Sequence, residues 1–145
     1  MKHVRTLTIV VLLLPAFSFC LQAEEQPLLT ATVPFAFAVA DVDLPPGSYT
    51  VSILLPFNII KVQSTDGRKV ATVFAVPSQK SLSSERAKLV FHRFGNQYFL
   101  VQVWEQGSNI HRDLQSGNRA RQLARSGDRM ESVTILANAT KDGSH

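Results

Sequence analysis

Two histidines are the residues of this chain best placed by type for acid–base chemistry. His92 lies in an apolar stretch and His111 in a polar one, and histidine is the side chain that most readily exchanges a proton near neutral pH. Neither histidine shares one face of a predicted strand or helix with a second histidine or a carboxylate, as metal ligands would require. We therefore expect no metal and no other cofactor.

A serine-hydrolase set can also be written from Ser83 or Ser84, His92 and Asp113. The chain has no Gly-x-Ser-x-Gly turn to position the serine, and a chain of this size offers such combinations by chance. We expect no catalytic residues and a non-enzymatic protein that binds or scaffolds a partner in the periplasm or outside the cell. One alternative is a small hydrolase that uses His92 or His111. Another is a structural subunit that assembles through an exposed edge strand.

Arginines are concentrated toward the C-terminal end, where five of them stand against two aspartates between residues 112 and 129. The guanidinium group binds phosphate and carboxylate in a planar, bidentate way. This segment predicts a candidate anion-contacting patch for a phosphate-rich envelope lipid, an acidic glycan or an acidic partner, formed by Arg112, Arg119, Arg121 and Arg125. The alternative is a solvated helix face whose arginines pair with nearby carboxylates and cover apolar surface.

The first 23 residues have the zones of a secretory signal peptide. Lys2 and Arg5 precede the uncharged stretch 6–21, and Ala23 stands before two glutamates. A basic start, a short apolar run and a small residue at the boundary predict cleavage after Ala23. We expect an exported protein, periplasmic or secreted, that does not span the membrane after cleavage.

Cleavage would change the composition of the product. Cys20 is the only cysteine of the chain, so the mature protein would lack disulfides and thiols. Lys2 and Arg5 would also be lost from the 15 Lys and Arg, while all 11 Asp and Glu remain, which leaves a net charge of +2. So small a charge does not predict a nucleic-acid partner.

The rest of the 145-residue chain predicts one β domain. We expect a flexible leader over 24–30, a single domain over 31–139 and a disordered tail over 140–145. Alternation of apolar with small or polar residues predicts strands near 33–40, 49–55, 58–64, 69–76, 88–94, 97–104 and 131–139. The expected fold is all-β, an antiparallel β-sandwich or small closed barrel of about seven or eight strands.

Local signals predict two hairpins and one helix. Asp66-Gly67 and Gly95-Asn96 are two-residue turn sequences. Counting outward from the second turn sets Phe91 opposite Leu100 and Val90 opposite Val101. A short helix is expected near residues 119–126, with Asn118 as its cap and Gly127 as its left-handed stop. Trp104, the only tryptophan, is either a core anchor or a ligand-stacking platform.

Four motifs resemble those of a family of small exported bacterial proteins of unknown function. They are Val33-Pro34-Phe35-x-Phe37, Leu44-Pro45-x-Gly47-x-Tyr49-Thr50-Val51, the run from Lys88 to Gly95, and Tyr98-Phe99-Leu100-x-x-Val103-Trp104. The resemblance covers most of residues 31–139 and implies export and a similar fold. The family has Gly-Arg and a basic, helix-like run after the tryptophan. This chain departs from it with His111-Arg112 and with Ser116-Gly117-Asn118, and the family has no assigned activity that could be carried over.

Overall fold

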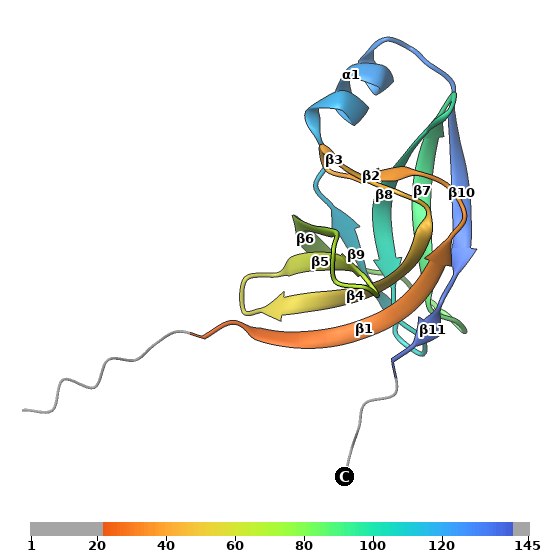
Figure 1. The fold of residues 1–145 in the computed structure, drawn as a ribbon. Coiled ribbons are helices and arrows are strands. Elements are labelled where there is room, and N and C mark those ends of the chain that lie inside the picture. The colour runs from red at the N-terminus through yellow and green to blue at the C-terminus, as the bar shows by residue number, and fades with distance from the viewer. Residues whose placement is uncertain (1–21, 141–145) are drawn as a thin grey trace, which may run out of the picture.

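The computed structural model describes residues 22–140 and confirms a mainly β protein with one short helix (Figure 1). The N-terminal half contains β1 Glu24–Val33, β2 Phe37–Val39, β3 Val42–Leu44, β4 Gly47–Leu55, β5 Ile59–Ser64 and β6 Val70–Gln79. The C-terminal half contains β7 Lys88–Phe94, β8 Gln97–Trp104, β9 Ile110–Leu114, α1 Asn118–Arg125, β10 Met130–Leu136 and β11 Asn138–Ala139. Nearly all of the predicted signal peptide and tail lie outside the described residues. No helix within 22–140 has the length and apolar character needed to cross a membrane.

The strands form a single open sheet, and this corrects two expectations. The order is β10-β7-β8-β9-β6-β5-β4-β1-β11, with β2 and β3 off this path. Over residues 22–140 the sheet is therefore not a closed barrel, and it has eleven strands rather than seven or eight. All pairs are antiparallel except one parallel contact between β2 and β8 at Ala38 and Phe99. The additional strands include β1, which extends over the expected leader, and the short strands β3 and β9, which come from polar, turn-like segments.

The two halves of the sheet enclose one core. β6 pairs with β5 through its first residues and with β9 through its last, so one strand belongs to both halves. Figure 1 shows β1 and β4 curving across toward β7 and β8, with β5 and β6 to one side. The buried cluster takes side chains from both halves, among them Leu29, Val51 and Ile60 from one and Phe91 and Leu100 from the other.

The expected leader is a paired strand. β1 begins at Glu24 and pairs with β4 from Glu24 opposite Leu55 to Val33 opposite Gly47. The segment looked free because its first four residues are polar or proline, and these are the exposed end of the strand. The expected strand over 33–40 is instead divided, because β1 ends before Pro34 and β2 begins at Phe37.

Both predicted hairpins form, but the second contains a bulge. The first pairs Val62 with Ala71, as expected. In the second, Phe91 does lie opposite Leu100, whereas Val90 lies opposite Gln102 instead of Val101. Because one extra residue reverses which face each later side chain occupies, Val103 turns into the core and Trp104 turns outward.

Candidate functional site

α1 lies across one end of the sheet and presents a small apolar stripe to it. Ala120 and Leu123 pack against a separate buried cluster of Ala38, Phe94 and Phe99. These contacts are spaced as one helical face. An eight-residue helix does not persist alone in water, so this packing holds the element and orients its other faces.

The N-terminus of α1 is capped by a residue from a distant turn, not by Asn118. Both carboxylate oxygens of Asp41 accept backbone hydrogen bonds, from Asn118 N at 3.0 Å and from Arg119 N at 3.1 Å. These two donors hold the pKa of Asp41 below its ordinary value of 3.8. The predicted stop is confirmed, since Gly127 has φ +77° just after the helix.

Arg119 is a second anchor of the helix. Its guanidinium bonds the Asp43 carboxylate, with Nη2 2.5 Å from Oδ1, and its Cζ lies 5.4 Å from the centre of the Phe99 ring. The bond to Arg119 lowers the pKa of Asp43. Arg119 therefore ties the helix to β3 and to β8. Its guanidinium is bound to Asp43 and does not form part of the open anion-contacting patch that the sequence predicts.

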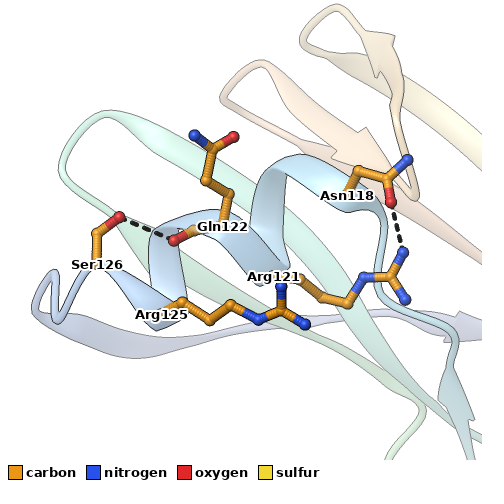
Figure 2. A pocket seen from close by; sticks show the side chains of 5 residues that line it. All are labelled: Asn118, Arg121, Gln122, Arg125 and Ser126. Atoms are coloured by element: carbon orange, nitrogen blue, oxygen red, sulfur yellow. Dashed lines mark hydrogen bonds between the residues drawn. The ribbon is translucent and has the colours of Figure 1, made fainter.

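Two arginines of the candidate patch do lie together on the open face of α1. Figure 2 shows Arg121 and Arg125 extending to the same side of the helix. With Asn118, Gln122 and Ser126 they line an open surface depression. Arg121 Nη2 bonds Asn118 Oδ1 at 2.5 Å. None of the ion pairs formed among residues 22–140 includes Arg121 or Arg125.

Arg112 belongs to a different part of the surface. It lies in β9 opposite Val103, and its Nη1 is 2.5 Å from Glu105 Oε2, beyond the end of β8. The helix contacts β8 near its beginning, at Phe99. Of the four predicted patch residues, the structure thus groups Arg121 and Arg125, uses Arg119 as an anchor, and pairs Arg112 elsewhere.

His111 is part of a polar network on the outer face of the sheet that sequence reasoning missed. Asp113 accepts hydrogen bonds from Ser78 Oγ at 2.5 Å and from Gln102 Nε2 at 2.8 Å, and His111 Nε2 lies 3.4 Å from its Oδ1. Gln102 in turn accepts from Trp104 Nε1 at 3.1 Å. The carboxylate lies between serine and histidine, so the histidine is not placed to take the serine proton as a hydrolase requires.

Trp104 is buried, as the core-anchor alternative predicts, but it lies away from the two apolar clusters. It is 4% exposed and belongs to neither cluster. The His111 ring stacks on it at 4.1 Å, and Nζ of Lys80 and of Lys88 lie 4.9 and 4.7 Å from its ring centre. A buried indole covered by cations and an imidazole is a packing element of the outer face.

His92 lies on the outer face of β7, opposite Phe99 in β8 and Ser132 in β10. Partial burial lowers its pKa. The hydroxyl of Ser84 donates to Arg86 O at 2.7 Å, and the Asp113 carboxylate is occupied by the network described above. The contacts of these residues do not form the set of Ser83 or Ser84, His92 and Asp113 written from the sequence.

In the part of the chain that the structure describes, no three His, Cys, Asp or Glu side chains are gathered as a metal site would need. No family model, curated protein or solved structure matches this chain. The clearest arrangement is the helix α1, anchored on one side and carrying Arg121 and Arg125 on the other.

Proposed function

We propose that this chain is an exported, non-enzymatic β domain that binds an anionic partner of the cell envelope or the exterior. The binding surface is the open face of α1 with Arg121 and Arg125. Export rests on the signal-peptide pattern of residues 1–23, and the resemblance to small exported bacterial proteins of unknown function agrees with it.

The observation that carries the proposal is the absence of a carboxylate partner for either arginine among the ion pairs of residues 22–140. Arginines four residues apart repel each other on a helix, at a cost of a few tenths of a kcal/mol. The neighbouring Arg119 satisfies its charge with Asp43. A phosphate or carboxylate group between the guanidinium groups of Arg121 and Arg125 would replace the missing partner and relieve the repulsion.

The anchors of α1 support the same proposal. Asp41, Asp43 and the apolar stripe hold the helix at its N-terminus and along its inner face. The exposed arginines therefore project from a helix whose position is already fixed. Binding a partner costs such residues less conformational entropy than it would cost the same residues on a flexible loop.

The first prediction concerns retention on the cell envelope. Replacing both arginines, Arg121→Gln with Arg125→Gln, removes two positive charges without touching the anchors. Wild-type protein should be retained on an anionic envelope fraction, less so as salt rises, and the double variant should lose most of this salt-sensitive retention. The measurement is the fraction sedimenting with washed envelopes over a salt series.

The matched control removes the same charge from other exposed arginines, with Arg68→Gln and Arg86→Gln, and should behave as wild type. Thermal unfolding should be nearly the same for all three proteins. Retention of the Arg121/Arg125 variant at the wild-type level would refute the proposal.

A further inference from the structure

β10 is a long free edge of the sheet. It pairs with β7 over all seven of its residues, with no shift of register, and with no other strand among residues 22–140. Every second residue of such an edge directs its backbone N–H and C=O away from the sheet. Val133 and Ile135 pack against the core, so this edge is held in place before any partner arrives.

Natural sheets protect their edges with lysine, proline, bulges or very short strands. The exposed edge of β1 follows this rule, because it begins with two glutamates and has an irregularity between Pro27 and Leu29. β11, at the end of the sheet order, has only two residues. β10 has no lysine, proline, glycine or bulge, and its one charged residue, Glu131, lies 3.7 Å from Arg93.

The sequence of β10 is complementary to itself. Met130 and Leu136 are exposed by 48% and 53%, and they stand at equal distances on either side of Val133. If two copies pair antiparallel with Val133 on the two-fold axis, Met130 of each copy meets Leu136 of the other. Ser132 then lies opposite Thr134, and Glu131 lies opposite Ile135, so no like charges face each other.

From this symmetry we propose that β10 is the docking edge for a second copy of this chain. The two β10 strands pair antiparallel about Val133 and join two sheets into one, as an isologous contact requires. One strand from each copy makes a small interface, so the dimer forms at high local concentration and dissociates on dilution.

The second prediction tests the edge by charge. Ser132→Lys with Thr134→Lys places lysines opposite lysines across the proposed contact, at two exposed positions. Wild type should shift from monomer to dimer between low micromolar and near millimolar concentration in sedimentation velocity, and the lysine variant should remain monomeric. The control Thr72→Lys with Gln97→Lys adds the same charge at exposed positions of β6 and β8 and should dimerise as wild type.

Cross-linking tests the register. In a Cys20→Ser background, Ser132→Cys and Thr134→Cys chains should form a disulfide cross-link under mild oxidation when mixed, because directly opposed residues lie within disulfide reach. Each variant oxidised alone should cross-link far less, because the like residues are diagonal neighbours about 7–8 Å apart. Monomeric wild type throughout the series, or a dimer that the lysines do not weaken, would overturn the proposal. Efficient cross-linking of one variant with itself would overturn the proposed register. Unchanged thermal unfolding of the lysine variant shows that the fold is intact, and none of these changes touches Arg121 or Arg125.

Discussion

At the scale of single residues, Gly117 allows α1 to reach its cap. A Cβ atom at this position would lie 2.5 Å from the backbone carbon of Ala40 and 2.5 Å from Asp41 Oδ1. Real Cβ contacts are never so close, so only glycine lets the start of the helix approach this turn. The sequence Ser116-Gly117-Asn118 departs from the basic run of the similar family. In the structure it is the place where the start of the helix meets the turn at Ala40 and Asp41.

The third prediction follows from this approach. Gly117→Ala should lower the free energy of unfolding by about 2 kcal/mol, because a backbone segment must move to admit the methyl group. The measurement is the urea midpoint followed by circular dichroism. Gly47→Ala is the control, since its Cβ would meet only the Tyr49 ring at 3.8 Å. Equal midpoints for the two variants would contradict the close contact.

At the scale of the element, α1 depends on two carboxylates from the turn and strand over 41–44. Asp41 accepts from the helix N-terminus and Asp43 binds Arg119. Both pKa values lie below the ordinary 3.8 because these donors stabilise the ionised forms. A group whose pKa falls on folding contributes stability above its unfolded value and loses that contribution as acid protonates the folded form.

The fourth prediction is that the attachment of α1 to the sheet weakens in acid. Below pH 3.8, and increasingly as pH falls through the lowered pKa values, the NMR shifts of Ala120 and Leu123 should move toward random-coil values. Asp41→Asn with Asp43→Asn should show shifted resonances already at neutral pH. Helix resonances that do not change down to about pH 2 would contradict this dependence.

At the scale of the molecule, β1 brings an N-terminal segment of the described chain beside a C-terminal one. It pairs with β4 along its length and with β11 at Leu29 and Thr30. Leu29 is fully buried in the common core. A segment with the composition of a leader therefore contributes both a sheet strand and a core side chain.

The fifth prediction distinguishes a strand from a leader. Leu29→Ala should lower the free energy of unfolding by about 2–5 kcal/mol, as expected for a buried leucine that leaves a cavity. Leu82→Ala, at a position 82% exposed, should change it by less than about 0.5 kcal/mol. Denaturant unfolding measures both. A negligible effect at Leu29 would mean that β1 contributes little to the fold.

Features that depend on near neighbours could be predicted from the sequence. The alternation of apolar residues indicated an all-β protein, Asp66-Gly67 placed the first hairpin in its correct register, and the helix and its Gly127 stop came within one residue. The exposure of Arg121 and Arg125 follows from the same helical spacing. Each of these rests on periodicity or turn chemistry within a few residues.

Features that depend on contacts between distant segments required the tertiary structure. Asp41 caps a helix 77 residues later, Arg119 turns to Asp43, and Glu24 pairs with Leu55. The bulge at Val101 reverses the side of Trp104, because strand register is decided by the whole face that must be buried. No local pattern records which backbone donor, carboxylate or strand edge will be nearby once the sheet has bent around its core.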